Sequence, residues 1–313
     1  MLRLAALIWG LASGQDGAAE LPRVAVVKSA DRAAYAQVLA GFSSELRAKV
    51  EEIDLDEKLE ADPRAIVRAL QPLAASRPKL VLAIGPTAAA SVRKMVPDVP
   101  VIFTMVPYYQ RYGLEAPNVT GIALTTDFAT QLDALKGAFP GVKRVGLLFD
   151  PRLSAGLAAE ARAAGEKLGL SMVPVEAESA RAEKAIPTAK GRVDAMLMLA
   201  DKTVATAQVV RRLIAFCESE KLPLLAISPS QVKEGATLSL SANPTALGAQ
   251  AGKVAARILL EHVDAGTLPV AQPEVLELSV SLGSTQRLTG SCDRSLELFR
   301  YAARKGYPVK VFE

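Results

Sequence analysis

Polar residues in this chain stand directly after a series of short apolar runs, and no catalytic motif accompanies them. The sequence contains no Gly-x-Ser-x-Gly, Walker A, Gly-x-Gly-x-x-Gly, Cys-x-x-Cys or His-Glu-x-x-His pattern. A single histidine, His262, and two cysteines, Cys217 and Cys292, exclude a multi-histidine metal site, a four-cysteine zinc site and a disulfide scaffold. We therefore expect non-covalent binding rather than catalysis, with no metal and no cofactor.

The residues that follow the apolar runs are the candidate ligand contacts, because ligands bind beyond the carboxyl ends of the strands in an open parallel sheet. In the first half of the chain these candidates are Ser29, Gly85, Pro86, Thr87, Thr104, Met105, Val106 and Tyr108. In the second half they are Asp150, Ser154, Asp201, Thr203, Ser228 and Ser230.

Four of these candidates have a structural alternative to ligand contact. Thr87 and Thr203 are expected at matching helix starts, where the hydroxyl caps the helix or the free N–H groups and the dipole favour an anionic ligand group. Asp150 and Asp201 either accept hydrogen bonds from a ligand amine or hydroxyl, or cap the helices that follow them. The sequence leaves both alternatives open.

Three further side chains need an interpretation. Tyr108 clusters with Tyr109 and Tyr112 in a chain with only 5% aromatic residues, which fits stacking on a flat ligand and equally fits the packing of a long loop. Cys217 lies in the apolar helical stretch 213–217 and is expected to pack as a small hydrophobic residue. His262 is expected at a solvated helix C-terminus.

The elements that position these residues follow from the alternation of apolar runs with helical patterns. Strands are expected at 23–27, 80–84, 101–104, 144–148, 195–199, 223–227 and 274–280. Helices are expected at 35–48, 87–95, 246–261 and 296–303. This βαβ alternation indicates an α/β fold with parallel sheets covered by helices on both faces.

The strand pattern of the first half recurs in the second half at a spacing of roughly 120 residues, which indicates two similar Rossmann-like lobes. We expect residues 22–122 plus 244–272 in the first lobe, 123–243 plus 273–285 in the second, and 286–313 as a C-terminal extension. The helix and strand after residue 243 cannot form a domain alone. The chain must therefore cross between the lobes more than once, which creates a multi-crossing hinge with a cleft.

Residues 1–19 are expected to be a signal peptide. One arginine precedes the apolar run 4–12, and small residues follow it, as in a secretory leader. Nine apolar residues form a helix of only about 14 Å, which is too short to span a bilayer. The alternative is a buried N-terminal helix. No cysteine lies near the expected cleavage point, so a lipoprotein is not expected.

Composition narrows the classes of partner. The 313 residues are 50% hydrophobic with a net charge of only +4, which excludes a disordered chain. No cluster of lysine and arginine with interleaved aromatic residues is present, so we expect no nucleic acid partner.

Several short motifs in the same order resemble a known family. They are AIGPTAA (83–89), PVIFT (100–104), NVTG (118–121), FDP (149–151), VDA (193–195), DKTV (201–204), VKEGA (232–236) and the run from Leu247 to Ala256. The chain resembles the periplasmic substrate-binding proteins of ABC transporters with the type I fold, and within these the tryptophan/tyrosine-type branch. The resemblance implies a periplasmic, monomeric protein that captures a small molecule by hinge closure and delivers it to an ABC permease.

The sequence departs from the family pattern at two places. Pro107, Tyr108 and Tyr109 stand where the family has a polar Thr-Asp-Pro stretch, and Ser228 stands where it has an acidic residue suited to a ligand ammonium. We therefore expect the cleft to bind a flatter and less cationic ligand than the family pattern implies, or no ligand. The alternative function is a sensory or envelope-accessory role with weak or no ligand binding. A third alternative, an enzyme, would need a base or nucleophile from the Asp, Lys and Ser residues of the cleft.

Overall fold

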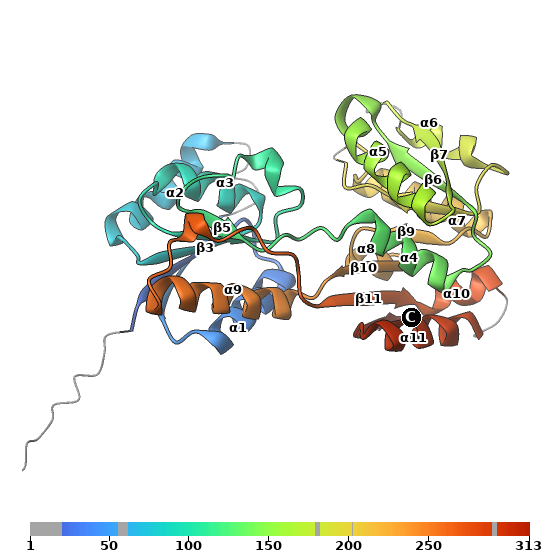
Figure 1. Cartoon of the computed structure of the whole chain (residues 1–313). Helices are drawn as coiled ribbons and strands as arrows, with labels where there is room; N and C mark the ends of the chain where they lie inside the picture. Colours follow the sequence, from blue (N-terminus) through green and yellow to red (C-terminus); the bar gives the residue numbers. More distant parts are fainter. Residues whose placement is uncertain (1–20, 56–61, 179–181, 202, 290–292) are drawn as a thin grey trace, which may run out of the picture.

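The computed structural model describes residues 21–55, 62–178, 182–201, 203–289 and 293–313, so the expected leader and Cys292 lie outside the described residues. The chain forms two lobes, each built on one β-sheet with helices on both faces (Figure 1). We call them the first lobe and the second lobe in chain order. The expected α/β class with two lobes is confirmed.

The sheet of the first lobe has the strand order β2-β1-β3-β4-β5, and all its pairings are parallel. Its strands are β1 (Arg23–Lys28), β2 (Lys49–Asp54), β3 (Leu80–Ile84), β4 (Val101–Thr104) and β5 (Val119–Gly121). β3 and β4 are buried along their whole length, whereas five of the six residues of the edge strand β2 are exposed. Continuous apolar runs are typical of central strands in a parallel sheet with two covered faces.

Helices cover both faces of this sheet. They are α1 (Ala33–Glu45) and α9 (Pro244–Leu260) on one face, and α2 (Pro63–Ser76) and α3 (Pro86–Met95) on the other. Alternate residues of β1 serve the two faces: Val24 and Val26 pack with α1 and α9, and Ala25 and Val27 pack with α2 and α3. The first lobe is therefore closed by α9, which comes from the chain after the second lobe.

The second sheet repeats this order and then extends it. Its order is β12-β11-β10-β9-β8-β6-β7, so β7-β6-β8-β9-β10 corresponds to β2-β1-β3-β4-β5 of the first sheet. The strands are β6 (Arg144–Phe149), β7 (Ser171–Glu176), β8 (Ala195–Met198), β9 (Leu224–Ala226), β10 (Leu238–Ala242), β11 (Leu276–Ser281) and β12 (Val309–Phe312). Only the β10–β11 pairing is antiparallel among the described strands.

Helices also cover both faces of the second sheet. One face carries α4 (Phe128–Ala138), α5 (Pro151–Lys167) and α11 (Asp293–Lys305). The other carries α6 (Ala182–Ala185), α7 (Ala207–Ser219) and α8 (Pro229–Lys233). Cys217 of α7 is a free cysteine buried in this second core, as expected, and burial raises the pKa of its thiol. α10 (Leu282–Thr289) follows β11 and contacts α7, α11 and β12.

The described chain passes between the lobes three times, at residues 123–127, at Asn243 and at residues 272–275 (Figure 1). Hydrogen bonds join the second and third crossings. Gln250 of α9 donates to the carbonyl of Gln272 over 2.9 Å and accepts from the amide of Glu274 over 3.2 Å. The amide of Asn243 donates to the carbonyl of Val275 over 3.0 Å. The second and third crossings are thus bonded to each other.

The C-terminal segment is tied to the second lobe. The Tyr301 hydroxyl of α11 donates to Asp133 of α4 over 2.8 Å, and Lys305 forms an ion pair with the same carboxylate over 2.8 Å. Gly137 leaves room for the Tyr301 ring, because a Cβ there would lie 2.3 Å from a ring carbon. β12 then pairs in parallel with β11 at the end of the sheet.

We predict that Gly248→Ala destabilises the protein, because helices α1 and α9 cross in backbone contact. A Cβ at Gly248 would lie 1.9 Å from the Val38 carbonyl oxygen. Such overpacking costs about 1–3 kcal/mol, which lowers the free energy of unfolding measured in denaturant titrations. Gly156→Ala in α5 is the matched control: no atom lies within 4 Å of its Cβ, so a gain of about 0.5–1 kcal/mol is expected. Equal effects of the two variants contradict the prediction.

We also predict that α11 is anchored in a pH-dependent way. The hydrogen bond and ion pair from Lys305 lower the pKa of Asp133 below its ordinary value of 3.8, against a partial rise from burial. The resulting stabilisation is complete above the ordinary value and is lost as the pH falls through the lowered pKa. Asp133→Asn should therefore be less stable than the parent at pH 7, and this difference should shrink below about pH 4.

Unfolding midpoints between pH 7 and pH 2 test this. Asp98→Asn, a change at an exposed carboxylate, is the control and should follow the parent throughout. A gap between Asp133→Asn and the parent that stays constant with pH contradicts the prediction.

Candidate functional site

The first half of the candidate site lies where β1, β3 and β4 end side by side. Lys28, Ile84 and Thr104 are register partners, so Ser29, Gly85 and Met105 begin the loops at the same sheet edge. The amide of Ser29 donates to the carbonyl of Ile84, and the amide of Gly85 donates to the carbonyl of Thr104, each over 2.9 Å. The parallel register thus brings the strand-end residues Ser29, Gly85 and Thr104 together.

The start of α3 shapes this edge. Gly85 has φ 95°, in the region that favours glycine, and a Cβ there would lie 2.5 Å from both the Ser29 hydroxyl and the Tyr35 hydroxyl. Pro86 opens the helix, and the half-buried Thr87 follows it. The Ser29 hydroxyl accepts from the amide of Ala88 over 2.9 Å, so a residue of another strand satisfies one N–H of the first helical turn.

The segment after β4 is held in an unusual backbone conformation. Met105 has φ 58° and Tyr108 has φ 48°, both in the left-handed region, which costs about 1–3 kcal/mol for a residue other than glycine. Val106 anchors the segment in the core of the first lobe. The Thr104 hydroxyl is buried and has no hydrogen-bond partner among the described residues. Strain and an unsatisfied hydroxyl therefore coincide at this predicted site.

The second half of the site lies at the ends of β6 and β8. Asp150 and Asp201 are each 1% exposed and are the buried carboxylates of the described residues. Asp201 accepts from the amides of Asp150 over 3.0 Å and Thr203 over 2.8 Å. Asp150 caps α5 by accepting from the amide of Arg152 over 3.0 Å, and it binds the Arg152 guanidinium through both of its carboxylate oxygens. Both carboxylates are therefore committed to protein donors.

The expectation that Thr203 starts a helix is wrong. α7 begins at Ala207, and Thr206 is its N-cap, whose hydroxyl accepts from the amide of Val209. Thr203 lies in the preceding turn, buried beside Asp201. Thr87 of α3 therefore has no helical counterpart at Thr203.

Ser154 marks a break inside α5. Its φ of −134° and ψ of 20° are not helical, and its hydroxyl is buried without a hydrogen-bond partner among the described residues. The hydroxyls of Ser228 and Ser230, at the end of β9, lie 2.8 Å apart, and Gln231 accepts from the amide of Ser228. Both serines follow β9 at the strand-end edge of the second lobe.

The tyrosine cluster divides between the lobes. Tyr109 and Tyr112, in the 3-10 helix η2 (Tyr109–Tyr112), pack against the core of the first lobe, and the Tyr109 ring centroid lies 5.2 Å from that of Phe103. Tyr108 packs against the core of the second lobe, and its pKa is raised mainly by burial. Sequence reasoning missed this contact, because no local pattern reports on the facing lobe.

Charges near the first sheet edge are likewise paired. Lys28, 8% exposed, forms ion pairs with Glu52 over 2.8 Å and Asp54 over 3.0 Å on the neighbouring strand β2. Burial alone lowers the pKa of Lys28, but these two carboxylates outweigh it and raise the pKa. Sequence reasoning also missed Arg152, which adds a side chain 65% exposed beside the buried Asp150.

No cluster of three or more His, Cys, Asp or Glu side chains suited to a metal ion occurs within the described ranges. Within the same ranges, no helix has the length and apolar character needed to cross a bilayer. His262 is exposed directly after α9, as expected.

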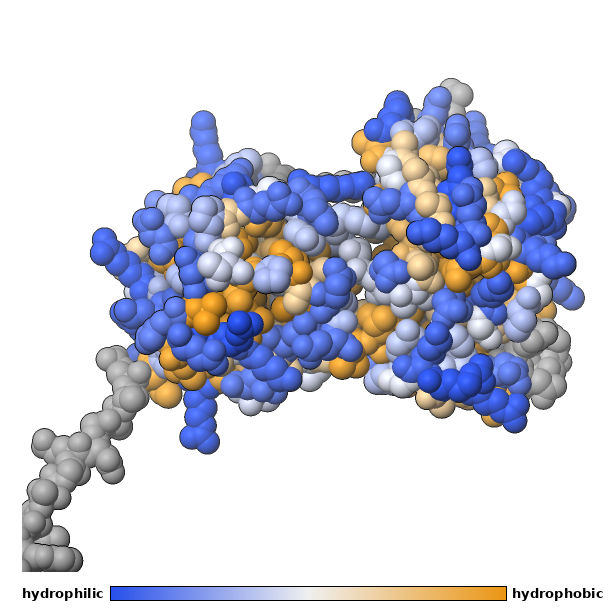
Figure 2. All heavy atoms as spheres, in the orientation of Figure 1, coloured by the Kyte–Doolittle hydropathy of each residue, from blue (hydrophilic) through white to orange (hydrophobic). Residues whose placement is uncertain are grey.

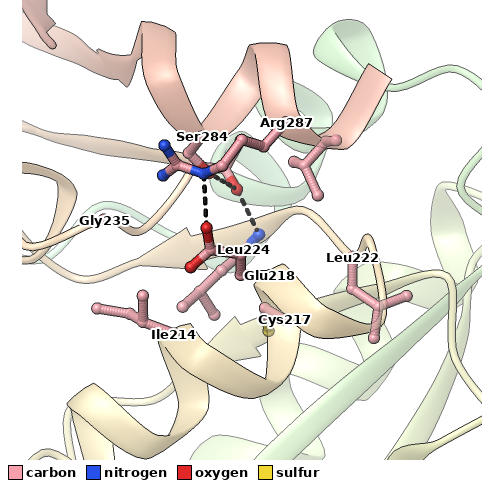
Figure 3. Close-up of a pocket in the computed structure, with 10 residues that line it drawn as sticks. Ile214, Cys217, Glu218, Leu222, Leu224, Gly235, Ser284 and Arg287 are labelled. Atoms are coloured by element: carbon pink, nitrogen blue, oxygen red, sulfur yellow. Dashed lines mark hydrogen bonds and ion pairs between the residues drawn. The ribbon is translucent and has the colours of Figure 1, made fainter. Parts of the chain in front are cut away.

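A separate pocket lies between α7 and α10 (Figure 3). Its lining includes Leu224 and Thr237, at the amino ends of β9 and β10, which is the edge opposite the candidate site. Its polar groups bind one another: Arg287 pairs with Glu218 over 2.7 Å, and the Thr237 hydroxyl accepts from the amide of Leu224. This pocket belongs to the packing of α10 rather than to the site.

Solved structures with the same fold come from several bacteria. The ligand-free, open structure of CD0873, a substrate-binding protein with adhesive properties from Clostridium difficile, has a TM-score of 0.78 at 17% identity and covers 94% of this chain and 100% of that chain. An ABC domain from Streptococcus pneumoniae in complex with L-Trp has a TM-score of 0.65 at 20% identity, covering 92% and 100%. A conserved domain protein from Vibrio cholerae has a TM-score of 0.64 at 22% identity, covering 86% and 95%. The fold is that of type I periplasmic-binding proteins.

The family follows from the sequence itself. The family model described as ABC transporter substrate binding protein matches residues 23–296. No curated protein shows significant sequence similarity to the chain. The chain belongs to the ABC transporter substrate-binding protein family, as the order of its motifs indicated.

We predict that the Thr104 hydroxyl does not stabilise the ligand-free fold. Thr104→Val replaces an unpartnered buried hydroxyl by a methyl group of similar size, so the free energy of unfolding should stay the same or rise by up to about 1 kcal/mol. Thr120→Val is the matched control, because the equally buried Thr120 hydroxyl donates to the carbonyl of Leu268 over 3.0 Å. That variant should lose about 1–2 kcal/mol in the same denaturant titration. A larger loss for Thr104→Val than for Thr120→Val contradicts the prediction.

Proposed function

We propose that this protein is the solute-binding component of an ABC-type uptake system and captures one small molecule between its lobes by hinge closure. The observation that carries this proposal is that each of the two lobes has a strand-end edge with a buried hydroxyl that no described group satisfies. Each edge presents a buried hydroxyl without a partner among the described residues, Thr104 on the first lobe and Ser154 on the second. Buried polar groups are normally hydrogen-bonded, so these hydroxyls are suited to a ligand.

The hinge supports the same proposal. The lobes are joined by three short connections, and the molecule is narrower between the lobes in the space-filling view (Figure 2). Short interlobe connections absorb the backbone rotation of hinge closure, while the two sheets move as rigid bodies. The proposed division of the chain places residues 22–122 and 244–272 on one side of this hinge and the second lobe, with residues 286–313 attached, on the other.

The ligand proposed is flat and not strongly cationic. Asp150 and Asp201 are already bound by protein donors, and Ser228 offers a hydroxyl where the family pattern has an acid. A ligand ammonium would therefore meet hydroxyls rather than a buried, uncommitted carboxylate. The related fold that holds L-Trp supports an amino-acid-like or planar organic molecule as the class to test first.

The proposed setting is the periplasm, with residues 1–19 as a cleaved leader. Family membership supports an extracytoplasmic protein with a small-molecule ligand and an ABC transporter context. The further proposals are an ABC permease as partner, a monomeric state, no nucleic acid partner and no catalytic activity. A sensory or envelope-accessory role is the alternative that the family match does not favour.

Ligand screening of residues 21–313 tests the proposal. The panel contains L-Trp, other amino acids, nucleobases, sugars and small organic anions, and the readout is the shift of the thermal unfolding midpoint. A ligand present at 100 times its dissociation constant should stabilise the protein by about 2.7 kcal/mol. Residues 21–313 contain no tryptophan, because the single tryptophan of the chain is Trp9. The fluorescence of L-Trp therefore reports its binding directly.

The matched variants make the outcome specific. We expect Thr104→Val and Ser154→Ala to reduce the shift produced by the active ligand, and Thr120→Val to retain it. The proposal is overturned if no compound of the panel shifts the unfolding midpoint of folded protein. It is also overturned if the shift is unchanged in both site variants.

A further inference from the structure

Tyr108 connects the lobes at a place where the polypeptide does not. It belongs to the segment that follows β4 of the first lobe, yet its ring packs against the core of the second lobe. The backbone of Ala200, just beyond β8, lies within hydrogen-bonding reach of the Tyr108 hydroxyl. Glu160 of α5 is near enough to affect the pKa of Tyr108. Both of these neighbours belong to the second lobe.

The rest of the same loop stays on its own lobe. Tyr109 and Tyr112 pack against the first core. The contact of Tyr108 with the second lobe is therefore a property of one side chain rather than of a loop that docks as a whole.

The backbone conformation that directs Tyr108 toward the second lobe is energetically unfavourable. Its φ of 48° and ψ of 56° are unusual for a bulky residue, and Met105, three residues earlier, also has a positive φ. The Arg111 guanidinium lies 5.2 Å from the centroid of the Tyr108 ring and covers it from the loop side. Such a conformation persists where surrounding contacts determine it.

We propose that Tyr108 is a fourth, non-covalent connection between the lobes, which restricts their separation and twist in the ligand-free molecule. The three covalent crossings define where the hinge is, and the Tyr108 contact defines how far the hinge opens. Because this role concerns the ligand-free protein, its test needs no ligand and is independent of the proposed solute.

The lobe separation can be measured by pulsed dipolar spectroscopy between two spin labels. Suitable sites are the exposed Lys94 of α3 and Lys167 of α5, changed to cysteine in residues 21–313 with Cys217→Ser and Cys292→Ser. We expect one narrow distance distribution for this parent and a distribution at least twice as wide after Tyr108→Ala.

Tyr112→Ala is the matched control, because it removes a half-buried ring from the same loop that packs only on the first lobe. It should keep the parent distribution. Tyr108→Leu, which retains apolar volume, provides a milder variant if Tyr108→Ala does not fold, and it should also widen the distribution. An unchanged distribution in the folded Tyr108 variants, or equal widening by Tyr112→Ala, overturns the proposal.

Discussion

The structure depends on a topological constraint: each lobe is completed by chain that has already passed through the other. The first sheet needs α9, which follows the second lobe, to cover the face formed by Val24, Val26 and their neighbours. The second sheet needs β11, which follows α9. Removal of either late segment would expose a buried apolar sheet face or leave β10 as an open edge. Each lobe therefore depends on chain that follows the other lobe, although each sheet has its own core, and hydrogen bonds of Gln250 and Asn243 join the second and third crossings.

Hydrogen bonds join the neighbouring strand ends of the candidate site within each lobe. On the second lobe, Asp201 accepts the amide that follows β6, so the ends of β6 and β8 are bonded to each other. On the first lobe, Ser29 fixes the start of α3. Polar residues that sequence reasoning assigned to a ligand thus also hold the edge together. The hydroxyls of Thr104 and Ser154 differ, because no described protein group satisfies them, and they carry the functional argument for that reason.

Much of this architecture could be predicted from sequence, and the failures have a physical cause. Apolar runs such as Leu80–Ile84 are buried on both faces, and their composition alone identifies them as central strands. β2 escaped prediction because its side chains are largely charged and exposed at the sheet edge. The helix start near Thr203 was misplaced because residues 199–205 separate the end of β8 from the cap at Thr206. Periodicity reports which face a residue occupies, but it does not report its hydrogen-bond partner, so the roles of Asp150 and Asp201 stayed open.

The position of Tyr108 gives a structural role to the segment that follows β4. Pro107, Tyr108 and Tyr109 follow β4, and the aromatic ring of Tyr108 is long enough to reach the facing lobe. Burying that ring against the second core is favourable, since an aromatic side chain removes a large apolar area from water. The free-energy cost of the positive φ of Tyr108 opposes that gain, so the net free energy that maintains the contact is not large. A connection of this strength restricts the proposed hinge without locking it, as the proposed closure on a ligand requires.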